Sequence, residues 1–368
     1  MDDEGTSNNG ILESGATPAP IRKQIRWWLL LLSCAGTAVG TIGGPLLQRL
    51  YYTHGGNRKW LSSWLQSVGF PILIPPLFFL YLKKLSQKTV TSTHFFMEPK
   101  IVFSSCILGV LLGINNYMYS TGLSYIPVST SSLLFSTELA FTALFAFFIV
   151  KQKFTFYSFN SVVVMTLGAA VLALHTNTDR PPGVTNAKYF LGFFLTLGGA
   201  ALLGLSLPLI EFSYGFSTRP ITYTVVLQFQ IVMNLVATIF VGVAMIINED
   251  FQAIPREARD YEIGEVKYYV VLVTTAIVWQ FLFLGLVGII YCSSSLFAGI
   301  LNSFLLPLTE VAAVVAYNEK FTGEKGLALA LCLWGFTSFF IGEYKKARKP
   351  EPTIEPTEDL SSHSNLQV

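Results

Sequence analysis

The chain has 368 residues, of which 52% are hydrophobic and 12% charged, and its formal net charge is +2. Soluble proteins are about 25% charged on average, so this composition excludes an ordinary soluble enzyme and a disordered protein. The small net charge excludes a nucleic-acid binder that acts through a strong basic field. An aromatic content of 14%, with 30 Phe, suits a surface in contact with lipid. The composition therefore predicts an integral membrane protein.

Ten apolar runs follow one another along the chain. A helix needs about 20 mostly apolar residues to cross the hydrocarbon core, and no run alternates as the strands of a β-barrel do. We therefore predict an all-α protein with ten transmembrane helices. The spans lie at approximately 27–50, 62–82, 101–122, 127–150, 156–174, 190–212, 222–247, 267–290, 292–316 and 324–344. The eighth and ninth almost merge near Tyr291 and Cys292.

Both ends of the chain are polar and lack an apolar run. We predict that residues 1–24 and 346–368 are disordered tails. An even number of spans places both tails on the same side of the membrane, and the distribution of Lys and Arg indicates which side that is. Placing the tails in the cytoplasm puts 14 of the 24 Lys and Arg residues on that side. The sequence thus favours cytoplasmic termini.

The two halves of the chain resemble each other weakly. Three such matches occur in order, with offsets of 163 to 167 residues: 45–48 with 208–211, Gly122 and Tyr125 with Gly288 and Tyr291, and 153–155 with 320–322. They predict two five-helix repeats, 25–174 and 190–345, joined by a non-cytoplasmic linker at 175–189. An odd number of spans inverts the second repeat, an arrangement that recurs in secondary transporters with a substrate site at the repeat interface. The alternative is chance similarity among apolar helices.

Three glutamates lie inside predicted spans, and no Lys or Arg lies mid-span to neutralise them. An ionisable group in a membrane costs several kcal/mol unless it faces a cavity or a partner. Glu138 is the deepest and is the first candidate for a proton carrier, followed by Glu211 and Glu310. Each has a structural alternative. Glu138 could be a neutral side chain bonded to a neighbouring helix, Glu211 an interfacial cap, and Glu310 a partner for carbonyls that Pro307 leaves free.

Amides and aromatic residues inside the spans are candidates for contact with a solute. Eight amides fall within spans: Gln48, Asn115, Asn116, Gln228, Gln230, Asn234, Gln280 and Asn302. Amides also join helices by hydrogen bonds, so each of the eight could either hold helices together or bind the solute. The spacing of Gln228 and Gln230 lets at most one of them face a central cavity. Carboxylates and amides without basic clamps disfavour phosphorylated solutes. An amide can read the amino and ring-nitrogen edge of adenine, and Trp64 can stack on a heterocycle or belong to an interfacial belt.

Several segments resemble a known family, the plant purine permeases of the drug/metabolite transporter superfamily. The resemblance covers residues 25–345 and is carried by 49–72, 129–155, 171–181, 203–214, 268–285, the LLPLTEV segment with the later EKF and EKG, and 331–343. It implies a ten-helix, two-repeat carrier with cytoplasmic termini in the plasma membrane. It also implies proton-coupled transport of adenine and related purines, including cytokinin bases and related alkaloids. The family's LPL-x-E and LLP-x-TE phrases fall on Glu211 and Glu310.

The sequence departs from this family at three positions. The family more often has Gln at the position of Glu138 and Glu at that of Gln228, which suggests that the two side chains face the same ligand or each other. Asn302 stands where the family is usually apolar and could tune substrate choice.

We therefore expect a proton-coupled purine carrier that works by alternating access. Glu138, Glu211 and Glu310 are the candidates for proton coupling, and the substrate-binding candidates are Glu138, Gln228, Asn302, Asn116, Trp64 and Gln280. No enzymatic motif, cofactor, metal site or nucleic-acid partner is expected. The alternatives are a carrier of nucleotide sugars or another heterocycle, and an uncoupled facilitator.

Overall fold

The computed structural model describes residues 19–86, 97–151, 156–174, 183–218, 221–318 and 321–348, and every regular element within these ranges is helical. The first seven elements are α1 (Ala19–Thr53), α2 (Lys59–Val68), the 3-10 turn η1 (Phe70–Leu73), α3 (Ile74–Ser86), α4 (Pro99–Tyr125), α5 (Val128–Phe135) and α6 (Glu138–Ile149). The rest are α7 (Phe156–Leu174), α8 (Asn186–Tyr214), α9 (Tyr223–Ile247), α10 (Asp250–Asp260), α11 (Glu265–Cys292), α12 (Ser295–Tyr317) and α13 (Gly323–Arg348).

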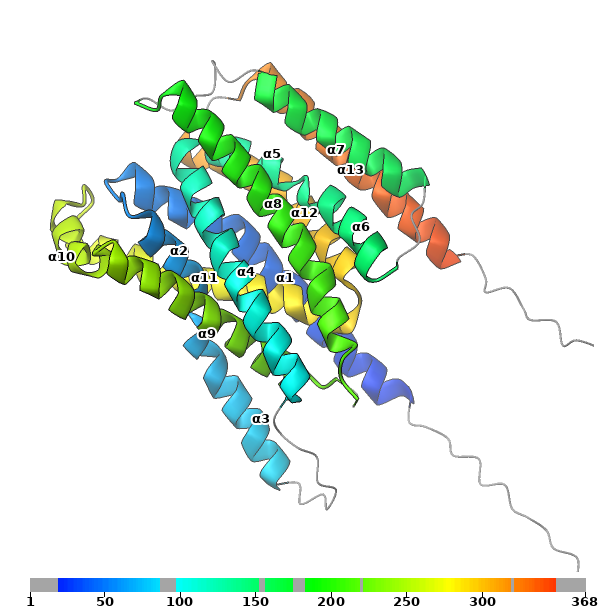
Figure 1. The fold of residues 1–368 in the computed structure, drawn as a ribbon. Helices are drawn as coiled ribbons and strands as arrows, with labels where there is room; N and C mark the ends of the chain where they lie inside the picture. The colour runs from blue at the N-terminus through cyan, green and yellow to red at the C-terminus, as the bar shows by residue number, and fades with distance from the viewer. Residues whose placement is uncertain are drawn as a thin grey trace, which may run out of the picture.

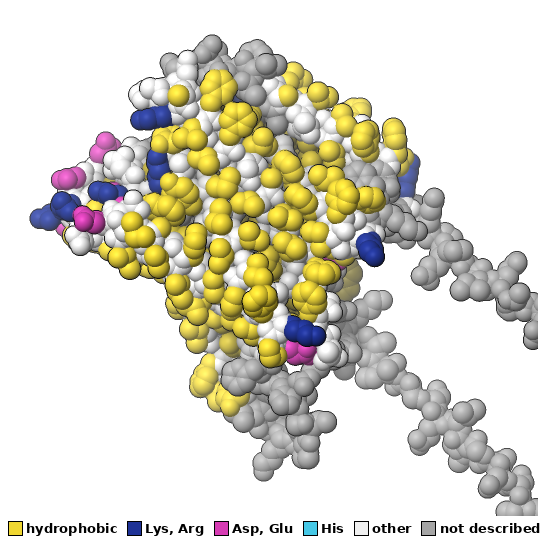
Figure 2. Space-filling view, in the orientation of Figure 1, with side chains coloured by type: hydrophobic (Ala, Val, Ile, Leu, Met, Phe, Trp, Pro, Cys, Tyr) yellow, Lys and Arg dark blue, Asp and Glu magenta, His cyan; other side chains and the backbone are white. Residues whose placement is uncertain are grey.

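The helices form a membrane bundle. Within the described ranges, nine helical segments are long and apolar enough to cross a bilayer, and α7 is a shorter apolar helix. Hydrophobic side chains cover the middle of the visible face and charged ones gather toward its ends (Figure 2). Large apolar side chains such as Phe148, Val315 and Ile247 are more than 60% exposed, as a lipid-solvated surface requires. The predicted ten-helix membrane fold is confirmed.

The second predicted span is interrupted near Pro71, where α2 gives way to η1 and then to α3, which extends away from the bundle (Figure 1). Proline has no N–H and cannot bond to the carbonyl four residues earlier, here that of Ser67. The Ser67 carbonyl accepts instead from the Gly69 N–H and from Gln280 of α11, whose Nε2 lies 3.2 Å from it and 3.1 Å from the Gln66 carbonyl oxygen. A side chain from another span therefore stabilises the break by hydrogen bonds to its carbonyl groups.

The fourth predicted span is also interrupted, between α5 and α6. The Ser136 hydroxyl donates to the Leu133 carbonyl at 2.6 Å and the Thr137 hydroxyl to that of Leu134 at 2.7 Å. Hydroxyls that bond to nearby backbone in this way compete with regular helix. Glu138 consequently begins a new helix in the middle of the predicted span, at the end where the helix dipole favours negative charge. Interrupted helices of this kind occur at the substrate sites of transporters.

Two pairs of long helices pack closely along each other. The first span, α1, packs along α11, and the sixth, α8, packs along α4. A Cβ atom at Gly288 would lie 2.3 Å from Ser33 Oγ, and one at Gly122 would lie 2.2 Å from Thr196 Oγ1. A side chain in place of either glycine would have to displace the facing hydroxyl. Ser33 and Thr196 are separated in sequence by nearly the same number of residues as Gly122 and Gly288.

Two boundaries differ from the predicted ones. Helix α1 begins at Ala19, inside the predicted N-terminal tail, and α13 continues to Arg348, inside the predicted C-terminal tail. The remainder of both predicted tails, and most of the predicted linker, lie outside the described residues. The loop after the seventh span contains an additional helix, α10, at one end of the bundle (Figure 1).

Candidate functional site

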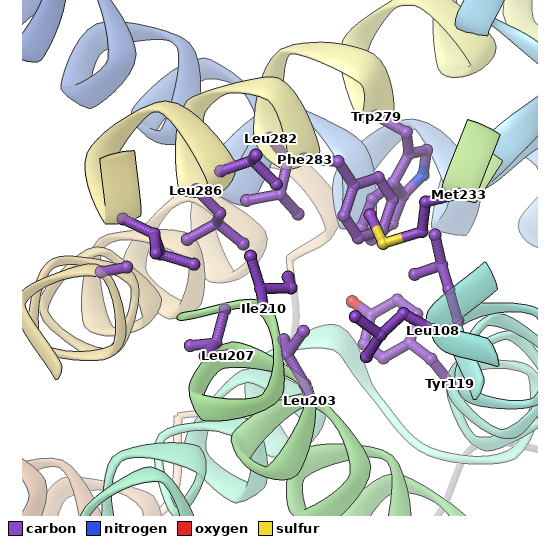
Figure 3. Packing of buried hydrophobic residues seen from close by; sticks show 14 of the residues in the cluster. Leu108, Tyr119, Leu203, Leu207, Ile210, Met233, Trp279, Leu282, Phe283 and Leu286 are labelled. Carbon is purple, nitrogen blue, oxygen red and sulfur yellow. The ribbon is translucent and has the colours of Figure 1, made fainter. Parts of the chain in front are cut away.

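A small cavity lies among the residues of the largest hydrophobic cluster in the described part of the chain. Figure 3 shows part of this cluster. Its volume is about 30 Å³, enough for about two waters at roughly 10–15 Å³ each and far below the roughly 300–1,000 Å³ of ligand pockets. The cavity in this structure is therefore too small for an organic ligand. Both halves of the chain line it, through Thr41, Pro45, Gln66, Asn115, Tyr119, Phe135, Leu203, Trp279, Leu282, Phe283, Asn302 and Leu306.

Aromatic rings form one side of this cavity. Trp279 and Phe283 of α11 stack with ring centroids 5.9 Å apart and an interplanar angle of 24°. Tyr119 meets Trp279 edge-on at 5.6 Å and Phe135 edge-on at 4.8 Å. Figure 3 shows Trp279 and Phe283 side by side, with Met233 against them and Tyr119 across from them. A planar heterocycle can stack on such faces.

Two buried polar atoms of the cavity lining have no hydrogen-bond partner among the described residues. They are Asn115 Oδ1, an acceptor, and Trp279 Nε1, a donor. Leaving a buried polar group unsatisfied costs about 1–3 kcal/mol, so such atoms concentrate where a ligand or water completes the bonds. A donor and an acceptor in one cavity lining are the two kinds of group that the edge of an aminopurine requires. From the sequence, Asn115 was one of eight candidate amides, and Trp279 was not among the candidate residues.

Glu138 contacts the cavity through another side chain. The carboxyl group is fully buried, and Oε2 accepts a 2.5 Å hydrogen bond from Asn302 Nδ2. Asn302 in turn lines the cavity and accepts a 2.8 Å bond from Thr41 Oγ1. Glu138 Oε1 has no partner in the described part of the chain. The structure thus brings together two of the predicted residues, Glu138 and Asn302, from different halves of the sequence.

Gln280 and Asn116 belong to the packing around the break in the second span. Gln280 satisfies carbonyls at the break and accepts a 3.2 Å bond from Asn234 Nδ2. The Asn116 carbonyl accepts from Gln66 Nε2 at 3.2 Å, while its side chain, also fully buried, is outside the cavity lining. Of this group, Gln66 alone faces the cavity.

The other predicted site residues lie outside the cavity lining. Glu211 accepts a 2.8 Å bond from the backbone N–H of Ser295 and so caps the first turn of α12. Trp64 packs edge-on against Phe251 of α10, with centroids 5.6 Å apart. Gln228 and Glu310 are both buried, on α9 and α12. That Glu138 and Gln228 face the same ligand stays a prediction.

A second polar cluster joins the bundle to α10. Arg58 Nη1 lies 3.1 Å from Asp250 Oδ1, and its Nε lies 3.8 Å from Glu257 Oε2. The hydroxyls of Tyr51 and Tyr268 also donate to Glu257. Burial raises the pKa of Asp250, and the neighbouring Arg58 charge opposes part of that increase. This cluster ties α1, α2, α10 and α11 together at one end of the molecule.

The family model and the curated relatives that match this chain agree in the function they name. Residues 28–349 match a family described as purine nucleobase transmembrane transport. The chain is 45% identical to "Purine permease 3" of Arabidopsis thaliana over 339 residues, which are 90% of this chain and 97% of the relative. It is 46% identical to "Purine permease 2" of the same plant over 87% of this chain and 93% of that one. A solved structure titled "Crystal structure of protein" is 17% identical with a TM-score of 0.49, covering 83% and 97% of the two chains.

Proposed function

Because the chain belongs to the purine nucleobase transmembrane transport family, we propose that it carries purine bases together with protons, by alternating access to its central cavity. The observation that carries this proposal is the cavity lining: stacked rings beside one unpaired donor and one unpaired acceptor. The protein is a transporter and not an enzyme.

The chemistry of the lining supports a purine as substrate. In the proposed complex Asn115 Oδ1 accepts from the exocyclic amino group of adenine, and Trp279 Nε1 donates to an adjacent ring nitrogen. Tyr119 and Phe283 pack against the ring faces. No Lys or Arg lines the cavity, which disfavours a phosphorylated substrate such as a nucleotide sugar. The cavity must widen to admit the base, because about 30 Å³ holds only waters.

Proton coupling is supported by Glu138. A fully buried carboxyl group whose polar contact is an amide from another span can exchange a proton only when the path to it opens. A group that is protonated from one side of the membrane and deprotonated from the other links proton flow to the facing state. We place Glu138 in this role ahead of Glu310, and we assign Glu211 to the capping of α12 because of its bond to Ser295.

The proposal also includes the membrane that holds the protein and the orientation of the chain in it. The proposed membrane is the plasma membrane, with both termini in the cytoplasm, on the basis of the Lys and Arg distribution. In that orientation α10 and the Arg58 cluster face away from the cytoplasm. The two inverted repeats meet at the cavity, and cytokinin bases are proposed substrates alongside adenine.

Uptake of radiolabelled adenine by yeast that lack their own purine uptake tests this function. We expect uptake to rise at acidic external pH and to collapse when a protonophore is added. Unlabelled purine bases should compete, and nucleotide sugars should not. The Glu138→Gln variant should still bind adenine while losing the dependence of uptake on external pH. Uptake that a protonophore leaves unchanged would establish an uncoupled facilitator, and proton-driven uptake by the variant would move the coupling site elsewhere.

A further inference from the structure

Three side chains form a hydrogen-bonded series from the cavity wall to the buried carboxyl group. Thr41 Oγ1 donates to Asn302 Oδ1 at 2.8 Å, and Asn302 Nδ2 donates to Glu138 Oε2 at 2.5 Å. All three are at most 3% exposed. Thr41 and Asn302 line the cavity, whereas Glu138 does not. The series therefore connects a titratable group to a cavity that it does not itself touch.

The direction of this series depends on the charge of Glu138. A carboxylate only accepts hydrogen bonds, whereas a protonated carboxyl group also donates one. The direction in the structure, with the Asn302 amide donating, is the one that a carboxylate requires, because a carboxylate has no hydrogen to donate. A proton on Oε2 would face the Nδ2 hydrogens, and a half-turn of the amide would remove this conflict by presenting Oδ1 to Glu138. Nδ2 would then face Thr41, whose hydroxyl can become an acceptor because it rotates freely.

We propose that Asn302 is a positioning residue that transmits the charge state of Glu138 to the substrate by reversing this series. The inference rests on the proton coupling proposed above. In the charged state the Thr41 hydrogen is used by Asn302. In the protonated state that hydrogen is free to be donated into the cavity, where a purine ring nitrogen can accept it. The protonated carrier thus gains one donor for the substrate, so proton and purine bind together.

The other titratable groups on the helices around Glu138 do not replace it as the carboxyl group that Asn302 contacts. Helix α6 packs against α7, α8 and α12. Their titratable side chains in the described ranges are Tyr157 on α7, Lys188, Tyr189, Glu211 and Tyr214 on α8, and Glu310 and Tyr317 on α12. All except Glu310 lie within four residues of a helix end. Glu310 is eight residues from Asn302, about 12 Å along the helix, so Glu138 is the carboxyl group that Asn302 contacts.

Equilibrium binding of adenine to the purified full-length protein in nanodiscs, at pH 5 and pH 8, tests the inference. For the wild type we expect affinity at pH 5 to exceed that at pH 8 by about tenfold, the effect of one hydrogen bond. Asn302→Leu should reduce this ratio to about 1. Thr41→Val should do the same while keeping the contact between Asn302 and Glu138, and it carries the test if the first variant folds poorly. The matched control is Asn160→Leu, which removes a 2.9 Å interhelical bond to Ser338 and should keep the full ratio.

A double variant tests whether Glu138 affects adenine binding only through Asn302. Once Asn302 is replaced by Leu, adding Glu138→Gln should leave adenine affinity unchanged at both pH values, because the cavity no longer senses the carboxyl group. A tenfold ratio that survives in both Asn302→Leu and Thr41→Val overturns the inference and leaves proton coupling standing. A wild type with equal affinity at both pH values and uptake insensitive to a protonophore overturns the coupling itself.

Discussion

Replacing Asn115 by Leu should stabilise the empty protein and weaken its binding of substrate. Asn115 Oδ1 is buried in the cavity wall and has no partner among the described residues. An unsatisfied buried polar group costs about 1–3 kcal/mol, and Leu has nearly the same shape without the polar atoms. We therefore expect unfolding to require about 1 kcal/mol more. For a chain of this length that raises the melting temperature by about 2 °C.

The same substitution removes the proposed acceptor for the amino group of adenine. One hydrogen bond contributes about 0.5–1.5 kcal/mol, so the dissociation constant should rise by up to about tenfold. Thermal unfolding in detergent and adenine binding in nanodiscs measure the two effects separately. A gain in stability together with a loss of adenine affinity distinguishes a residue that binds substrate from one that only packs.

Gln230 offers the matched control. It is fully buried on α9, both of its side-chain polar atoms lack partners in the described ranges, and it lies outside the cavity lining. Gln230→Met should therefore stabilise the protein without changing adenine affinity. If Asn115→Leu lowers the melting temperature and leaves affinity intact, Asn115 is a structural residue and the proposed reading of the cavity is wrong.

Two further predictions concern residues that shape the bundle. Gln280→Leu removes the donor that this side chain supplies to the Gln66 and Ser67 carbonyls at the break in the second span, of which that of Ser67 keeps its bond from the Gly69 N–H. We therefore expect a loss of about 1–3 kcal/mol in stability, seen as a lower melting temperature; an unchanged value would mean that the break does not depend on this side chain. Arg58→Ala leaves buried Asp250 without its partner and should destabilise the protein at neutral pH, whereas Asp250→Asn should not. Burial raises the Asp250 pKa above 3.8, so the folded protein binds the proton more tightly than the unfolded chain and stability falls as pH rises through that raised pKa. Melting curves between pH 4 and pH 7 check this, and a destabilising Asp250→Asn would contradict it.

The membrane fold follows from the sequence because span length and hydropathy are one-dimensional properties. The division between α11 and α12 falls near Tyr291 and Cys292, where the two runs almost merge, with α11 ending at Cys292. The two interrupted spans were not predicted, although Pro71 and the Ser136-Thr137 pair are signals that could have indicated them.

The site was only partly predictable, and the reason is physical. Lipid and protein interior are both apolar, so a span shows little contrast between its outer and inner faces, and its rotation cannot be read from hydropathy. A buried carboxyl group is costly at any rotation, which is why Glu138 could be selected from the sequence. Trp279 is as compatible with lipid as with a cavity, so only the packing of the helices distinguishes the two.

The glycine contacts between spans have a consequence for how the carrier can move. Ser33 and Gly288 lie in different halves of the sequence, and so do Gly122 and Thr196. Each pair is a close contact between a glycine on one helix and a hydroxyl side chain on another, and we expect such tight packing to resist sliding of the two helices past each other. We therefore expect the two helices of each pair to move together in the proposed transport cycle, although they belong to different predicted repeats. On this proposal each moving unit contains helices from both halves of the sequence, and we expect the joints of the motion to lie at the interrupted spans.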